Sequence, residues 1–190
     1  MKSASRALSG LTPRAREIVR AARELLEKEG PGALSMRRLG ERVGMRAPSI
    51  YEHFRDKQAL VAALISVGFE EQADLFDRAA ESADPLQALA TAYRDFARRQ
   101  PHMYRLLTEQ PLRRDLLVPG VEEAAALPLL RAVGGDVERA RAVWAFAHGM
   151  VILELNRRFP PGADLDQTWR TGIGAFVRPD GAAKVTRRRS

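Results

Sequence analysis

Cysteine is absent from this chain of 190 residues. A disulfide framework, a thiolate nucleophile and a thiol redox sensor are therefore excluded, and we expect a cytoplasmic protein. Aromatic residues are also scarce, at 6%, but apolar residues as a whole make up 45% of the chain and charged residues 29%. This balance supports a buried core and excludes disorder throughout the chain.

Long apolar runs are lacking as well. The most apolar stretch runs from Val143 to Leu155 and is interrupted by His148 and Glu154. It is shorter than the ~20 residues that a membrane-spanning helix needs, and we identify no apolar signal core near the N-terminus. We therefore expect no contact with a membrane.

The charge is basic and unevenly distributed. Residues 1–60 contain 13 basic and 7 acidic residues, a net charge of +6, whereas residues 61–177 contain 13 and 16, a net charge of −3. Residues 178–190 contain 5 basic residues and 1 acidic residue and too few apolar ones to pack, so we expect a disordered basic tail. The basic N-terminal part indicates a polyanionic partner, and nucleic acid is the first candidate.

Helical periodicity dominates the chain, and no segment shows the sustained alternation that is typical of strands. The predicted class is all-α, with about nine helices. Capping residues, prolines and glycines mark their expected ends. Three helices are expected at residues 13–30, 35–44 and 49–54, and three more start at 56, 85 and 101 and extend past 69, 96 and 107. A seventh helix ends at residue 134 and is expected to kink or restart at Pro128. The last two are expected at 136–159 and 165–177.

A helix-turn-helix layout spans Ser35 to Leu60. A short capped helix, a tight turn at residues 44–46 and a second short helix let the second helix lie across the first, and Gly40 would let them approach closely. A rod of this kind can enter the major groove of DNA, which is about 12 Å wide. The predicted small core consists of Leu39, Val43, Met45, Ile50 and Phe54.

This part of the chain resembles the TetR family of bacterial transcriptional repressors from about Thr12 to Leu64. The resemblance rests on Ser35, Arg38–Glu41, Val43–Gly44 and, above all, the pattern Ser49-Ile50-Tyr51-x-His53-Phe54-x-x-Lys57-x-x-Leu60. It departs from most members at Gly40, where they have alanine, and this concerns helix packing. The resemblance implies phosphate contacts by Ser35, Tyr51, His53 and Lys57, and base contacts by Arg46, Ala47, Pro48 and Ser49.

The residue chemistry supports some of these roles independently. Lys57 lies in the first turn of a helix, where a cation opposes the helix dipole by roughly 0.3 to 1 kcal/mol, a cost that a nearby phosphate would reverse. Arg46 is able to donate to guanine O6 and N7. Tyr51 and His53 supply donors to phosphate oxygens, and the alternative is that they form the rim of a small helical core.

The resemblance implies a helix-turn-helix domain at residues 1–57 and a ligand-binding and dimerisation domain at 58–177, followed by the tail. The apolar helix that starts at Asp136 carries two apolar faces, one around Trp144 and His148 and one around Phe146 and Met150. A helix with two apolar faces needs two partners. One face is predicted to line the body and the other to meet a second subunit.

Two sets of candidate residues follow for the body. Apolar walls with a few polar groups are typical of small-molecule sites, although each residue alone also fits an ordinary core. The candidate ligand contacts are Phe69, Phe76, Tyr93, Phe96, Met103, Tyr104, Trp144 and His148. The candidate dimer contacts are Phe146, Met150, Leu153, Trp169 and Ile173.

An enzyme is the rival class. The histidines His53, His102 and His148 lie far apart in the sequence without metal-ligand spacing, and no glycine-rich phosphate loop is present. We therefore predict no catalytic residue, no metal and no cofactor. A second alternative is an architectural DNA-binding protein without a ligand. The favoured prediction is a homodimeric repressor that a partly apolar small molecule releases from a palindromic double-stranded DNA operator.

Overall fold

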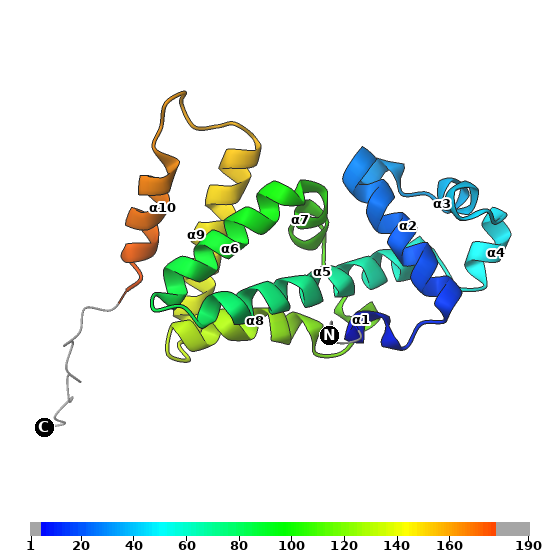
Figure 1. Cartoon of the computed structure of the whole chain (residues 1–190), viewed down its shortest axis with the longest axis horizontal. Helices are drawn as coiled ribbons and strands as arrows, with labels where there is room; N and C mark the ends of the chain where they lie inside the picture. Colours follow the sequence, from blue (N-terminus) through cyan, green and yellow to red (C-terminus); the bar gives the residue numbers. More distant parts are fainter. Residues whose placement is uncertain (1–4, 178–190) are drawn as a thin grey trace, which may run out of the picture.

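The computed structural model describes residues 5–177, so the predicted basic tail at 178–190 lies outside the described residues. The described residues form ten α-helices and no strand (Figure 1), which confirms the all-α class. Within them, no helix combines the length and the apolar character that crossing a membrane requires. The helices are α1 (Arg6–Ser9), α2 (Pro13–Glu29), α3 (Met36–Val43), α4 (Ala47–Tyr51), α5 (Lys57–Ala80), α6 (Pro85–Arg99), α7 (Pro101–Thr108), α8 (Val121–Ala132), α9 (Val137–Leu155) and α10 (Leu165–Gly174), with single 3-10 turns at Pro31–Ala33 and Arg114–Leu116.

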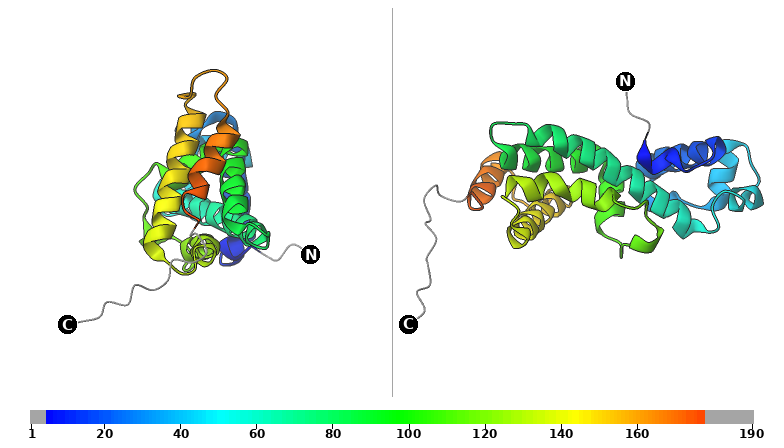
Figure 2. Two further views of the ribbon diagram at one scale, coloured as in Figure 1. Left: turned by 90° about the vertical axis from the view of Figure 1, so that its left-hand side faces the viewer. Right: turned by 90° about the horizontal axis from the view of Figure 1, so that it is seen from below.

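The molecule is elongated, with a small head at one end and a larger body at the other. Helices α2, α3 and α4 form the head, and the long helix α5 runs from the head into the body (Figure 1). Helix α8 lies along α5, and α9 and α10 lie at the end of the body that is far from the head (Figure 2). Helix α5 is thus the element that the head and the body share.

Short polar side chains set the starts of most helices. The Asp56 carboxylate accepts the backbone N–H of Ala59 at 2.8 Å and begins α5. Such caps satisfy amides that the first helical turn leaves without partners. Equivalent caps are formed by Thr12, Ser35, Asp84, Asp136 and Asp164 at α2, α3, α6, α9 and α10.

Helix α1 is the element that periodicity did not predict, and it raises the count above the expected nine. Its first backbone amides, at Arg6 and Ala7, donate to the carboxylate of Glu70 on α5. At its other end, the Arg16 guanidinium donates to the carbonyl of Leu8 at 2.9 Å. A helix of four residues has no periodic pattern of its own, and contacts with distant residues hold it in place.

Several helix boundaries differ from the sequence prediction. Helix α9 ends at Leu155 and α10 at Gly174, short of the expected ends at 159 and 177. Helix α4 covers Ala47–Tyr51 rather than residues 49–54. Helix α8 continues through Pro128, so the expected restart at this proline is wrong. Proline removes one helical hydrogen bond, but Pro128 is fully buried, and this packing favours an unbroken helix.

Candidate DNA-binding surface and ligand cavity

Helices α3 and α4 approach each other closely at Gly40. A Cβ atom added at Gly40 would lie 2.6 Å from the carbonyl oxygen of Met45, and the N–H of Met45 donates to the carbonyl of Gly40 at 2.8 Å. The close approach predicted from the sequence is therefore confirmed. The core beneath is also as predicted: Leu39, Ile50 and Phe54 are buried, and Val43 and Met45 pack against them.

Arg14 of α2 fixes the end of α3, a role that sequence reasoning missed. Its guanidinium donates to the carbonyl of Val43 at 2.6 Å and to the sulfur of Met45 at 3.1 Å. The last carbonyls of a helix have no partner within the helix. Arg14 therefore supports the turn that precedes α4.

The eight predicted DNA contacts lie around α4 and the two helix starts beside it. Arg46, Pro48 and Lys57 are exposed, and half of the surface of Tyr51 is exposed. The other four, Ser35, Ala47, Ser49 and His53, are half-buried. Ser35 also caps α3, because its hydroxyl oxygen accepts the N–H of Arg38 at 3.3 Å.

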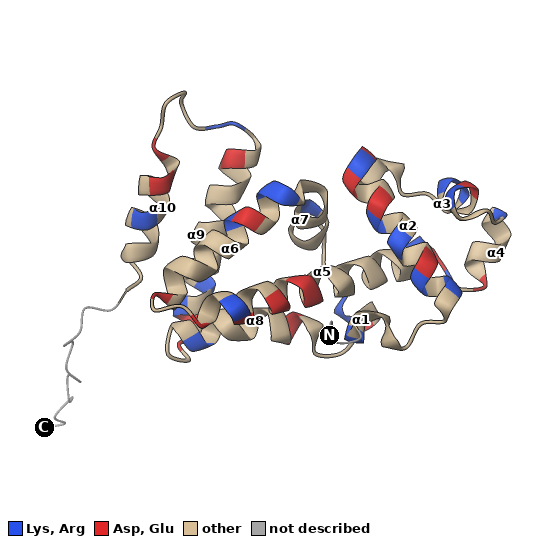
Figure 3. Cartoon of the chain, viewed as in Figure 1, with Lys and Arg blue, Asp and Glu red and all other residues tan. Residues whose placement is uncertain are grey.

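Cations of the head differ in whether a carboxylate neutralises them. Figure 3 shows basic residues along α3 and at the turn into α4. The three arginines of α3 are paired: Arg37 with Glu41 at 2.9 Å, Arg38 with Glu29 at 2.5 Å and Arg42 with Glu24 at 2.7 Å.

By contrast, Arg46 and Lys57 form no ion pair or hydrogen bond through their side chains within residues 5–177. Their charges are thus available to an external anion. This difference separates two cations that can meet DNA directly from the arginines of α3, which provide a more general basic face.

The head is attached to the body through partly buried polar contacts. Arg23 of α2 donates to Glu71 of α5 at 2.7 Å and also to the side chain of Gln100. Burial raises the pKa of Glu71, and Arg23 opposes that rise. The Glu27 carboxylate accepts the N–H of Met103 at 2.9 Å. Helix α2 is therefore tied to α5 and to the start of α7.

A cavity of about 630 Å³ lies in the body between α5, α6, α8 and α9. This volume is in the range of small-molecule sites. Four of the predicted ligand contacts line it, and they come from three helices: Phe69 and Phe76 from α5, Tyr93 from α6 and Trp144 from α9. The remaining walls are mostly aliphatic, from α6, α8 and α9.

The other four predicted ligand contacts do not line this cavity. Met103 and Tyr104 have no exposed surface, because α7 packs them into the core. His148 lies behind the wall, with its Nδ1 2.7 Å from the hydroxyl of Tyr104. Phe96 faces a different hollow between α5 and α6.

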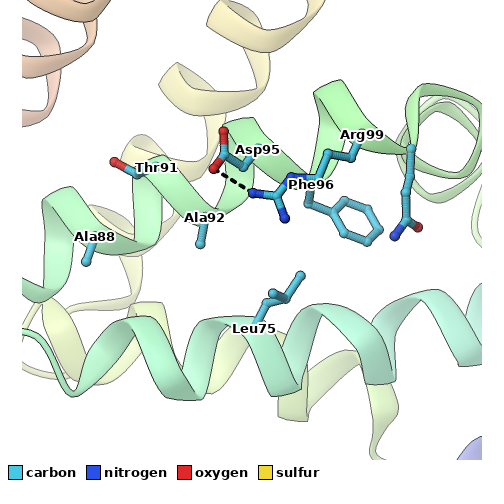
Figure 4. Close-up of a pocket in the computed structure, with 8 residues that line it drawn as sticks. Leu75, Ala88, Thr91, Ala92, Asp95, Phe96 and Arg99 are labelled. Carbon is cyan, nitrogen blue, oxygen red and sulfur yellow. Dashed lines mark hydrogen bonds and ion pairs between the residues drawn. The ribbon is translucent and has the colours of Figure 1, made fainter.

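That second hollow is smaller, about 380 Å³, and Figure 4 shows its lining. Leu75 forms one side, and the α6 residues from Ala88 to Arg99 form the other. Arg99 is largely exposed and pairs with Asp95 at 3.0 Å. We regard it as a surface groove between two helices rather than the main ligand cavity.

A buried polar network lies beside the main cavity. The hydroxyl of Tyr104 lies 3.0 Å from the hydroxyl of Tyr93, and the two rings meet edge to face. Burial raises the pKa of Tyr93 to about 12, and hydrogen bonds with Tyr104 and Trp144 oppose the rise. Burial also raises the pKa of Tyr104. Both phenols therefore stay protonated well beyond neutral pH.

Sequence reasoning missed Gln72, a buried residue in the cavity wall. It lies three residues after Phe69 and four before Phe76, so helical spacing could have placed it on the same face. Residues from the segment after α7, including Gln110, Leu112 and Arg114, also line the cavity. No periodic signal marks a residue in such a connection.

The five predicted dimer contacts divide into two groups. Met150, Trp169 and Ile173 are buried inside one protomer, and Phe146 packs against Trp169 with ring centroids 5.9 Å apart. The contact of Phe146 with Trp169 links α9 to α10 within the chain. A surface for a second subunit cannot be built from the three buried side chains. Leu153 is 41% exposed and remains a candidate contact.

A charged cluster secures α10 against the body. Arg94 of α6 bonds Glu154 of α9 at 3.0 Å and Asp166 of α10 at 2.5 Å. Glu154 also accepts the indole N–H of Trp169. Glu154 is therefore a structural residue that joins three helices.

Comparison with known proteins connects the head and the body to one family. Residues 18–64 match the family model for bacterial regulatory proteins of the tetR family, and residues 86–176 match the tetracyclin repressor-like C-terminal domain. The HTH-type transcriptional regulator YobS of Bacillus subtilis (strain 168) is 29% identical over 171 residues, which cover 84% of this chain and 88% of YobS. The class A tetracycline repressor from transposon 1721 of Escherichia coli is 47% identical over 47 residues, which cover 25% of this chain and 22% of the repressor.

Solved structures agree with this assignment. A protein from Rhodococcus sp. RHA1 superimposes with a TM-score of 0.73 at 27% identity, covering 88% of this chain and 95% of that one. The multidrug binding protein EbrR, complexed with ethidium, shares the fold with a TM-score of 0.70 at 20% identity, covering 87% and 99%. The two matched regions and the shared fold together show that this chain belongs to the TetR family of DNA-binding transcriptional regulators.

Proposed function

We propose that the protein is a homodimeric repressor that binds a palindromic operator and leaves it when a partly apolar small molecule enters the 630 Å³ cavity. The observation that carries this proposal is the course of α5. This helix begins at Lys57 in the DNA-binding surface and contributes Phe69 and Phe76 to the cavity wall. A change in the position of α5 on ligand binding would therefore move the head.

On the DNA side, two heads would place their α4 helices in successive major grooves, with centres about 34 to 36 Å apart. Tyr51, His53 and Lys57, with Ser35, would hold phosphates. Arg46 and the first turn of α4 would meet base edges. The free charges of Arg46 and Lys57 support these roles, because neither cation has to leave a carboxylate first.

On the ligand side, release requires a conformer in which the two heads no longer match the groove spacing. A ligand can shift the balance only through its different affinities for the two conformers. A preference of 10⁴-fold corresponds to about 5.5 kcal/mol. Arg23 and Glu71 tie α2 to α5 beside the cavity, so the head would follow α5 rather than move independently of it.

Dimerisation is proposed on the outer face of α9 and α10. Ala142, Ala145 and Leu153 are exposed along α9, and a Cβ atom added at Gly149 would meet nothing within 4 Å. A second copy of the α9 and α10 pair across a two-fold axis would form a four-helix bundle. This assignment replaces the buried Met150, Trp169 and Ile173 with exposed residues of α9.

The charged groups that line the cavity favour regulation over catalysis, because each is already paired with an opposite charge. Glu122 accepts two hydrogen bonds from Arg114, each 2.7 Å long, and Arg141 pairs with Glu138 at 2.5 Å. All of these groups are at least partly exposed. The cavity itself favours a ligand-responsive regulator over an architectural DNA-binding protein.

Selection of bound duplexes from a random DNA pool tests the proposal. We expect enrichment of one sequence with two inverted half-sites and a footprint on both. Enrichment without symmetry, or binding without any sequence preference, would contradict a dimeric operator-binding repressor and favour an architectural protein.

A further inference from the structure

Gln72 is a largely buried residue whose amide faces the cavity without a protein partner among the described residues. Its side chain lines the main cavity, and only 5% of the residue is exposed. Within the described residues, the Gln72 side chain forms no hydrogen bond or ion pair. Gln72 is not among the fully enclosed and unpaired side-chain atoms of the described residues, so its amide keeps contact with the open volume of the cavity. Glutamine can donate twice and accept twice. This residue is thus prepared for a partner that enters the cavity.

The other buried polar groups of the lining already have partners. The hydroxyl of Tyr93 lies 3.0 Å from that of Tyr104. The Thr108 hydroxyl donates to the carbonyl of Tyr104 at 2.8 Å. Gln110 is exposed to solvent. Among the described residues of the wall, Gln72 therefore provides the free hydrogen-bonding group at depth.

The charged residues that line the cavity are partly exposed and already paired. They are Arg114, Glu122 and Arg141. Around Gln72 the helix contributes Phe69 and Phe76. An ionised group placed there would lose its hydration without meeting an opposite charge, which is strongly unfavourable.

Building on the proposed repressor function, we propose that the effector is an uncharged molecule with an apolar body and one neutral donor–acceptor group, such as an amide or lactam, that pairs with the carboxamide of Gln72. Two hydrogen bonds between the amides satisfy both partners. The aromatic and aliphatic walls take up the apolar body. Gln72 is then the residue that selects the effector class.

Three probes of the same shape separate charge from hydrogen bonding: 2-naphthamide, the 2-naphthoate anion and the 2-naphthamidinium cation. A fourth, 2-isopropylnaphthalene, has a similar size but no hydrogen-bonding group. Titration calorimetry with the full-length protein measures their affinities. We expect 2-naphthamide to bind at least tenfold more tightly than either ion, because only the neutral amide pairs with Gln72 without burying a charge.

Two substitutions at Gln72 test whether this residue is responsible. In Gln72→Leu, the ratio of the affinities for 2-naphthamide and 2-isopropylnaphthalene should fall about tenfold, because the amide loses its partner. Gln72→Glu should instead gain affinity for the amidinium. The matched control, Gln87→Leu, makes the same chemical change on α6 outside the cavity and should leave the ratio unchanged.

The outcomes distinguish this inference from the proposed function. Equal binding of the neutral and ionic probes, or an unchanged ratio in Gln72→Leu, would overturn the inference while leaving a ligand-responsive repressor intact. Binding of none of the four probes would overturn the inference as well. Failure of the operator selection would overturn the repressor proposal, whatever the probes do.

Discussion

The hydroxyl of Tyr104 lies 2.7 Å from Nδ1 of His148. Tyr104 comes from α7 and His148 from α9, and Tyr93 of α6 extends the contact at 3.0 Å. Because Tyr104 has no exposed surface, these bonds replace water for its hydroxyl. One buried phenol therefore holds three helices in register behind the cavity wall.

Removal of this hydroxyl should destabilise the body. Tyr104→Phe leaves the hydroxyl of Tyr93 and the ring nitrogen of His148 without this partner, so the free energy of unfolding should fall by about 1 to 3 kcal/mol. Urea titration measures the loss. Tyr51→Phe removes an exposed hydroxyl and should change stability by less than about 0.5 kcal/mol. Equal effects of the two substitutions would refute a structural role for the network.

Stability should also fall in alkaline solution because of Tyr93. The folded chain keeps this phenol protonated up to a pKa of about 12, whereas an unfolded tyrosine ionises near pH 10. Between these values the unfolded state binds fewer protons than the folded state, so stability decreases as pH rises. The contribution is complete below about pH 10, amounts to roughly 2 to 3 kcal/mol and is lost through pH 12.

Denaturation curves at several pH values check this dependence. Tyr93→Phe should reduce the decline of stability between about pH 10 and 12, since one of the two buried phenols with a raised pKa is gone. A variant as steep as the wild type would show that Tyr93 ionises normally in the folded protein.

Lys57 should contribute to DNA affinity without reading the sequence. Lys57→Ala should weaken binding to all duplexes by similar factors and reduce the salt dependence by about one phosphate contact. Arg37→Ala is the control, because Arg37 is paired with Glu41 and should contribute less. Filter binding over a range of salt concentrations measures both slopes, and an unchanged slope for Lys57→Ala would exclude the phosphate contact.

Arg46 should contribute to sequence preference. In Arg46→Ala we expect a loss of about 1 to 3 kcal/mol of discrimination at one base position of each half-site, with preferences elsewhere retained. Repeating the operator selection with the variant measures this effect. A preference identical to that of the wild type would place Arg46 away from the base edges.

Leu153 should be needed for association of two copies. Leu153→Glu places a charge on the proposed α9 face and should give monomers in sedimentation at micromolar concentration. Leu127→Glu is a matched control, because Leu127 of α8 is similarly exposed, at 40%, but lies outside that face. If only the Leu127 variant became monomeric, the interface between the two copies would lie on α8 instead of α9.

Local pattern was sufficient for the head. Caps such as Ser35 and Asp56 act on amides within one helical turn, and Leu39, Ile50 and Phe54 reach a common core through one short turn. These interactions join residues close in sequence, so spacing and residue type are enough to predict them. The helix-turn-helix and the all-α class followed from this local information.

The body depended on contacts between distant residues, which only the tertiary structure supplied. An aromatic residue on a helical stripe, such as Phe69 or Tyr104, has the same local pattern whether it faces a cavity or another helix. The packing of α7 buries Tyr104, and the separation of α5 from α9 leaves Phe69 facing open volume. Glu70, which holds α1, and Gln72, which lacks a partner, acquire their roles from elements far away in the sequence, because burial is a property of the assembled helices.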